Sequence, residues 1–159
     1  MTRKEQYEQL TTQIVGLIKD ETNLIGILAN VSAALHDTFP ERFFWVGFYL
    51  QAHGNMLRLG PFQGSVACYT IPYGKGVCGK AWEEGHTLIV PDVETFPGHI
   101  ACSSLSRSEI VVPMYDDAHT FRGVLDIDST RLNDFDEDDK EGLGRIIDLL
   151  MEETQDLFL

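Results

Sequence analysis

The sequence predicts an α+β fold in which helices pack on one face of a largely antiparallel sheet and the other face is available to a ligand. Three observations support this prediction. Strand-like segments follow one another without regular strand–helix alternation, helical periodicities flank them at both ends of the chain, and 159 residues leave room for one core. We therefore expect a single domain over residues 1–159.

Helices are expected at both ends of the chain. In the first, apolar residues recur at helical spacing at Tyr7, Leu10, Ile14 and Leu17. The second follows a predicted N-cap at Thr22, and its apolar positions are Leu24, Leu28, Val31 and Leu35. Pro40 then interrupts the pattern. A C-terminal helix after the acidic stretch 134–139 would bury Leu143, Ile146, Leu150 and Leu157.

The central segment has the pattern of strands separated by turns. Residues 43–50 form a short aromatic and aliphatic run typical of a central strand, and His53-Gly54-Asn55 predicts a hairpin to the next. The predicted strands cover residues 43–50, 56–62, 65–71, 87–91, 109–114 and 121–129, with a short helix from about Gly76 to Gly85. Residues 91–107 are expected to form a long irregular loop because Pro97-Gly98 interrupts regular structure there.

Composition and charge limit the function classes. Hydrophobic residues make up 43% of the chain and charged residues 23%, which is typical of a soluble globular protein. With 12 Lys and Arg against 25 Asp and Glu, the net charge of −13 opposes contact with phosphate backbones, so no nucleic acid partner is expected. No apolar run reaches membrane-spanning length and the first residues lack a signal-peptide core, so we expect a cytoplasmic location and no membrane partner.

The first strand places amphipathic aromatic side chains on one face. Trp45, Gly47 and Tyr49 point to one side, and the residues that point to the other are Phe44, Val46, Phe48 and Leu50. Gly47 is expected to leave a gap between the two rings that accepts an apolar group such as a thioether methyl. Ordinary core packing around a glycine bulge is the alternative.

Three carboxylates are candidates for one cluster. Asp126 and Asp128 share a face of the last strand, and Glu109 joins them if its strand is a neighbour in the sheet. In a desolvated pocket at least one of their pKa values should rise, so that one carboxyl polarises an oxygen while another holds an ammonium. The alternatives are a strand end facing solvent and, more weakly, a hard-cation site.

The three cysteines, Cys68, Cys78 and Cys102, are spaced by ten and 24 residues, without the paired spacing of a zinc ribbon or a thioredoxin-like motif. They are candidates for reactive thiols, with inert buried thiols as the alternative. Cys78 follows Gly74-Lys75-Gly76 at a predicted helix start, which would lower its thiol pKa. Cys102 lies in the long loop after His99, and a zinc site of three cysteines and His99 is a weaker alternative.

Several motifs together resemble the free methionine-(R)-sulfoxide reductases, which are GAF-domain enzymes. The resemblance runs from about Trp45 to Ser129, in order and with all three cysteines present. It is carried by Leu59-Gly60-Pro61-Phe62-Gln63-Gly64, Ile71-Pro72-Tyr73-Gly74-Lys75-Gly76-Val77-Cys78-Gly79, Val90-Pro91-Asp92-Val93, Phe96-Pro97-Gly98-His99-Ile100-Ala101-Cys102 and Ser108-Glu109-Ile110-Val111-Val112-Pro113. Ser103 departs from the pattern, in which an acidic residue commonly follows the third cysteine.

The resemblance implies a GAF-like six-stranded antiparallel sheet, with the terminal helices on one face and a small pocket on the other. It implies that a thiolate attacks the sulfur of free methionine-(R)-sulfoxide, that methionine leaves, and that the sulfenic acid condenses with a second cysteine. Thioredoxin would then reduce the disulfide, with no cofactor and no metal. Together with the terminal helices, the resemblance is compatible with a homodimer.

Carried over residue by residue, the resemblance makes Cys102 the nucleophile, Cys68 the resolving thiol and Cys78 an auxiliary thiol, although the helix-start argument favours Cys78 as nucleophile. The sulfoxide oxygen and the substrate ammonium would be held by Glu109, Asp126 and Asp128, with Trp45 and Tyr49 lining the pocket. Backbone N–H groups of the Cys102 loop and of residues 76–79 would bind the substrate carboxylate.

Two other functions fit parts of the pattern. A non-catalytic GAF sensor of small ligands would use the same fold, but sensors normally carry an output domain, and no residues remain here to build one. A thiol peroxidase would use the same cysteines, but peroxide needs no ammonium site and would leave the three carboxylates unexplained.

Overall fold

The predicted α+β architecture is confirmed by the computed structural model, which describes residues 1–158. The elements along the chain are α1 (Arg3–Ile18), α2 (Leu24–Thr38), β1 (Trp45–Ala52), β2 (Met56–Gln63), β3 (Thr70–Pro72), α3 (Gly76–Glu84), β4 (Leu88–Val90), η1 (Val93–Thr95), β5 (Ser108–Tyr115), β6 (Phe121–Ser129), α4 (Glu137–Thr154) and η2 (Gln155–Leu157).

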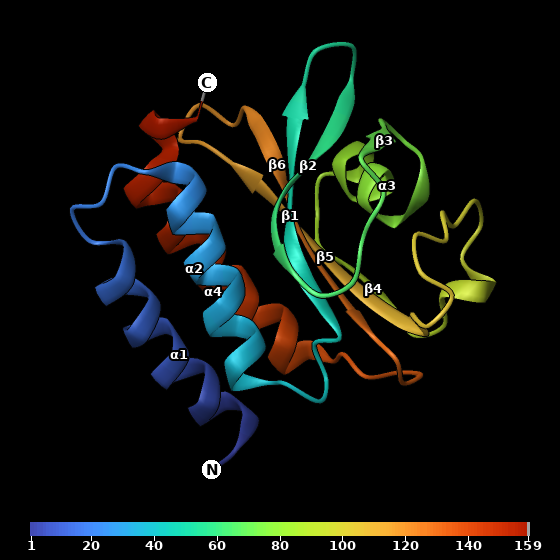
Figure 1. Ribbon diagram of the computed structural model, residues 1–159, viewed down its shortest axis with the longest axis horizontal. Coiled ribbons are helices and arrows are strands. Elements are labelled where there is room, and N and C mark those ends of the chain that lie inside the picture. Colours follow the sequence, from blue (N-terminus) through green and yellow to red (C-terminus); the bar gives the residue numbers. More distant parts are fainter. Residues whose placement is uncertain (159) are drawn as a thin grey trace.

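One antiparallel sheet organises the molecule, with the strand order β3-β2-β1-β6-β5-β4. Helices α1, α2 and α4 lie on one side of this sheet, whereas α3 and the long loop before β5 lie on the other (Figure 1). The sheet therefore separates a helical layer from the face that carries the functional residues.

The alternation of side chains along the strands creates two apolar clusters, one on each face. Val46 and Phe48 of β1 pack with the helices, together with the apolar side chains of β6 that alternate with its aspartates, Leu125 and Ile127. Trp45 and Tyr49 belong to the cluster on the opposite face, as expected. Phe44 is expected on the helical side but packs against the cluster on the opposite face, because it precedes β1 and does not follow the alternation.

The helical layer is held together by a buried ionic cluster around Asp139, which is 0% exposed. Its carboxylate accepts hydrogen bonds from Tyr7 Oη of α1 at 2.6 Å and from Arg42 Nη2 at 2.8 Å. Asp139 also closes the capping box at the start of α4 by accepting from the backbone N–H of Asp136. One side chain thus fixes α1, α4 and the segment before β1.

Several predicted boundaries are wrong. The N-cap of α2 is Asn23, not Thr22, because Glu21 accepts the backbone N–H of Thr22 and the Asn23 side chain caps Gly26. In α1, Ile18 is buried and Leu17 is 41% exposed. The strand predicted over residues 65–71 is confined to β3, and Leu157 lies in η2 beyond the end of α4.

Candidate active site

A hollow with a cavity volume of about 40 Å³ opens on the face of the sheet opposite the helical layer. Seven of the eight residues expected at the site line it: Trp45, Tyr49, Cys78, Cys102, Glu109, Asp126 and Asp128. The eighth, Cys68, does not line the hollow but is bonded to Cys102. The predicted convergence of a loop sulfur with three acids is therefore present.

The register of the sheet brings the three carboxyl groups together. Strands β5 and β6 are neighbours, and Glu109 pairs directly with Asp128 across them. Asp126 lies two residues before Asp128 on the same face of β6 and pairs with Gly47 of β1. Glu109 and Asp126 are only 5% and 6% exposed, and Oδ1 of Asp126 has no hydrogen-bond partner within residues 1–158. An unpartnered buried oxygen is costly unless a ligand satisfies it.

Burial changes the protonation of this cluster. Loss of water contact raises the pKa of Glu109 well above its usual value, and the nearby carboxyl groups of Asp126 and Asp128 raise it further. The pKa values of Asp128 and Asp126 are also raised, mainly by burial. The site can thus hold a neutral carboxylic acid that donates a hydrogen bond to an oxygen, as well as an anion for a cationic group.

Aromatic side chains form one wall of the hollow. The rings of Trp45 and Tyr49 lie 5.9 Å apart, and Phe62 of β2 stacks on Trp45 at 5.1 Å. The prediction that Gly47 leaves an open gap is wrong. Phe62 of β2 occupies the position that a Cβ on Gly47 would take, so the lack of a side chain at Gly47 lets β2 approach β1 closely. The expected apolar wall of Trp45 and Tyr49 is present, and Phe62 supports it by stacking on Trp45.

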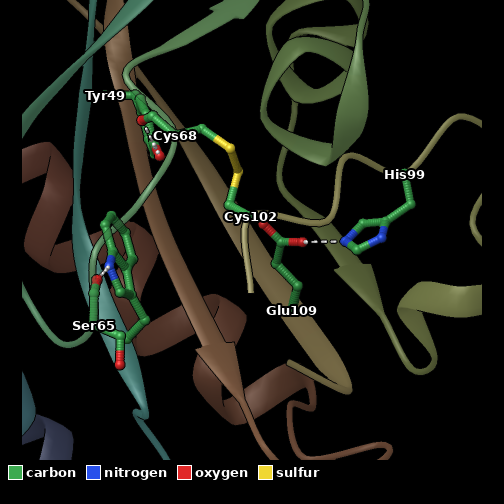
Figure 2. The surroundings of a disulfide bond; sticks show 7 residues. Tyr49, Ser65, Cys68, His99, Cys102 and Glu109 are labelled. Atoms are coloured by element: carbon green, nitrogen blue, oxygen red, sulfur yellow. Dashed lines mark hydrogen bonds and ion pairs between the residues drawn. A yellow bond between two sulfur atoms is a disulfide. The ribbon is translucent and has the colours of Figure 1, made fainter. Parts of the chain in front are cut away.

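The polar ends of these aromatic residues hold the segment between β2 and β3. Trp45 Nε1 donates to the carbonyl of Ser65 at 3.0 Å, and Tyr49 Oη donates to the carbonyl of Cys68 at 2.9 Å (Figure 2). Because these backbone groups bond to side chains, residues 65–69 do not extend β3 as predicted. The segment is irregular and carries Cys68 over the hollow.

Cys68 and Cys102 form a disulfide, with a Cα–Cα distance of 5.4 Å (Figure 2). This pair lies within the separation of about 7 Å that disulfide formation requires. The two sulfurs bond to each other, so the zinc site of three cysteines and His99 does not form. The loop from residue 91 to 107 is irregular as expected, except for the single turn η1.

Cys78 is the free thiol of the hollow and is 3% exposed. The prediction that its helix position lowers the thiol pKa is wrong. Burial raises the pKa of Cys78 well above its usual value, and Asp126 and Glu109 raise it further. The helix dipole and Lys75 are outweighed because a thiolate here would be desolvated next to acids. This environment disfavours Cys78 as an activated nucleophile.

Besides Cys102, the loop before β5 contributes four residues to the hollow that were not predicted as site residues: His99, Ile100, Ser103 and Ser106. His99 Nε2 lies 3.9 Å from Oε1 of Glu109, and its ring is turned toward that carboxyl (Figure 2). Ile100 packs 3.2 Å from the position of a Cβ on Gly76, which has a φ of +61°. Only the motif around Cys102 signalled His99 and Ile100, because a loop has no periodicity from which to infer direction.

No helix within residues 1–158 is both long and apolar enough to span a bilayer.

Comparison with known proteins places the chain in a family. The GAF domain family matches residues 19–151. "GAF domain-containing protein A" of Dictyostelium discoideum is 58% identical over 94% of this chain and 92% of that protein. The free methionine-R-sulfoxide reductase of Escherichia coli is 42% identical over 92% of this chain and 87% of its own length.

The same relationship holds in three dimensions. The X-ray structure of free methionine-R-sulfoxide reductase from Neisseria meningitidis in complex with its substrate superimposes with a TM-score of 0.93 at 46% identity, covering 98% of this chain and 92% of that one. Sequence and structure agree over nearly the whole length of both proteins. The chain therefore belongs to the GAF-domain family of free methionine-R-sulfoxide reductases.

Proposed function

We propose that this protein reduces free methionine-(R)-sulfoxide to methionine, with Cys102 as the nucleophile. The observation that carries the proposal is the presence of Cys102, Glu109, Asp126 and Asp128 around one hollow. A sulfoxide needs a soft nucleophile at sulfur and a proton donor at oxygen, and the ammonium of a free amino acid needs an anion. The cluster offers all three.

The reaction proceeds in two covalent steps. The thiolate of Cys102 attacks the sulfoxide sulfur, and the S–O bond breaks. The oxygen is transferred with one proton to the sulfur of Cys102, which becomes a sulfenic acid, and methionine departs. The thiol of Cys68 then attacks the sulfenic sulfur, water leaves, and the disulfide forms. The bond between Cys68 and Cys102 supports this order of events.

The three carboxyl groups have different roles in the proposed reaction, which follow from their surroundings. Glu109, whose pKa burial raises well above its usual value, donates the proton to the sulfoxide oxygen. Asp126, with its unpartnered Oδ1, and Asp128 hold the substrate ammonium. The ammonium in turn favours their ionised forms, because an opposite charge at contact lowers a carboxyl pKa.

The substrate carboxylate meets the start of α3. Lys75, the N-cap, provides no side-chain hydrogen bond there, and Gly76 and Val77 line the hollow. The first N–H groups of a helix favour anions. A peptide bond would remove both the ammonium and the carboxylate, so the site selects the free amino acid.

Thioredoxin, a dithiol reductant, restores the two thiols by disulfide exchange. Assembly as a homodimer, a single domain over residues 1–159 and a cytoplasmic location stay predictions.

A turnover assay tests the proposal. The protein is incubated with each sulfoxide epimer of free methionine, or with peptide-bound sulfoxide, together with thioredoxin, its reductase and NADPH. We expect NADPH consumption with the free R epimer only. Cys102→Ser should abolish turnover, and Cys78→Ser is the matched thiol variant that should retain it. No turnover by the wild type would favour a ligand sensor, and turnover surviving Cys102→Ser would move the nucleophile to Cys78.

A further inference from the structure

We propose that His99 returns the proton to Glu109 after each turnover and so connects the buried carboxyl with solvent. The inference rests on the proposed function, in which Glu109 gives its proton to the sulfoxide oxygen. His99 acts through Glu109 and does not touch the reacting atoms.

The geometry places an imidazole between Glu109 and water. His99 Nε2 faces Glu109 Oε1 at 3.9 Å, a distance that one water molecule or a small loop movement spans (Figure 2). The Glu109 side chain is 7% exposed, whereas the His99 side chain is 16% exposed. Because His99 and Cys102 share one loop, the segment that presents the sulfur also presents the ring.

The other titratable side chains around the hollow are poorly suited to this task. Asp126 and Asp128 of β6 are committed to the substrate ammonium, and Asp126 is as buried as Glu109. Cys78 of α3 and Tyr49 of β1 have raised pKa values, chiefly from burial, and keep their protons. Burial lowers the pKa of His99, which leaves a neutral ring with one donor and one acceptor nitrogen near pH 7.

The proton balance requires such a carrier. When the S–O bond breaks, the proton of Glu109 leaves with the oxygen on Cys102, and Glu109 remains as a carboxylate. That anion lies beside Asp126 and Asp128, so its charge is unfavourable. The imidazole takes a proton from a hydronium ion or buffer acid of the solvent at Nδ1 and passes its Nε2 proton to Oε1, so the ring ends neutral and no hydroxide is left in the site. No further oxidant or reductant takes part.

Time-resolved infrared spectroscopy of a single turnover tests the inference. Fully reduced protein is mixed with one equivalent of free methionine-(R)-sulfoxide, and the carbonyl band of protonated Glu109 is identified by its loss in Glu109→Gln. In the wild type we expect the band to recover together with methionine formation. In His99→Gln and in His99→Phe, methionine should form at about the wild-type rate, because Glu109 already holds its proton. Recovery of the band should be about tenfold slower or more, within the usual range for positioned proton transfer.

Two controls separate proton transfer from a structural role. Added imidazole should speed the recovery in His99→Gln, which a merely structural defect would not allow. His86→Gln removes an exposed histidine at the end of α3 and should behave as the wild type. Recovery at the wild-type rate in the His99 variants, or recovery insensitive to imidazole, would overturn the inference. Absence of methionine with the wild type would instead overturn the proposed function, and the inference with it.

Discussion

At the scale of single residues, the site depends on carboxyl groups that the fold keeps away from water. The pairing of β5 with β6 forces Glu109 and Asp128 together, and burial raises the pKa of each well above its usual value. Such a group is protonated in the folded state at a pH where it is ionised in the unfolded chain. Function is therefore obtained at the expense of stability.

Glu109→Gln should lower kcat/KM and raise stability at neutral pH. Because the folded-state pKa of Glu109 is raised, its favourable contribution is complete below the unfolded-state pKa of about 4.3 and is lost as pH rises through the raised value. The variant has no such loss, so its free energy of unfolding should decline less with pH in urea titrations. Removal of the proton donor should cost about 10²-fold to 10⁴-fold in kcat/KM.

The matched control for this substitution is Glu94→Gln, at an exposed position of η1. It should change neither kcat/KM nor the pH dependence of the free energy of unfolding. A Glu109→Gln variant with wild-type kcat/KM would show that the carboxyl has no part in the reaction.

The sequence predicts the acids better than the residues around them. Alternation along β6 places Asp126 and Asp128 on one face from the sequence alone, and Glu109 follows once β5 and β6 are paired. The contact of Phe62 with Gly47 depends on the irregular register between β1 and β2, and the position of His99 depends on the path of a loop. Neither position follows from periodicity or propensity. The thiol pKa of Cys78 was misjudged because burial, which a helix-start argument omits, dominates it.

At the scale of elements, α1 and α4 depend on Asp139. Its carboxylate has no exposure and is bound by Tyr7, by Arg42 and by Arg3, whose Nη1 lies 3.2 Å away. The guanidinium of Arg42 is itself only 12% exposed and lies 5.2 Å from the ring of Phe39. Loss of the acid would leave this cation without its main partner in an apolar setting.

Asp139→Ala should therefore destabilise the protein by about 3–5 kcal/mol, the usual cost of breaking a buried pair on one side. Urea denaturation measures this change. Asp138→Ala, at an exposed neighbour in the same turn, is the control and should have a small effect. The folded fraction of Asp139→Ala should keep its turnover number, because the helical layer lies across the sheet from the hollow. A stability equal to that of the wild type would contradict this role for Asp139.

Some elements are determined by local sequence patterns, whereas the limits of others depend on residues that are distant in sequence. The apolar periodicity that predicts the helices is a local signal, and it locates α1, α2 and α4, although the N-cap of α2 is Asn23 and Leu157 lies beyond the end of α4. The strand expected over residues 65–71 is shortened because Trp45 and Tyr49 bind backbone carbonyls of that segment and Cys68 bonds to Cys102. Those partners are distant in sequence, so propensity alone could not identify them.

At the scale of the whole molecule, the sheet separates the residues that stabilise the helical layer from the residues of the candidate active site. The helical face holds the larger apolar cluster and the Asp139 cluster, while the opposite face holds the acids and all three cysteines. Two irregular segments, from either side of α3, are joined beside the hollow by the disulfide between Cys68 and Cys102 (Figure 2).

In the proposed reaction, the sulfur of Cys102, set above buried acids, takes the oxygen from the sulfoxide and passes the oxidation to Cys68. The most direct test is mass spectrometry of fully reduced protein after one equivalent of free methionine-(R)-sulfoxide, with remaining thiols alkylated. We expect one methionine released per chain, a Cys68–Cys102 disulfide and an alkylated Cys78. Methionine released with Cys78 oxidised, or with Cys68 and Cys102 both still alkylated, would contradict the proposed reaction.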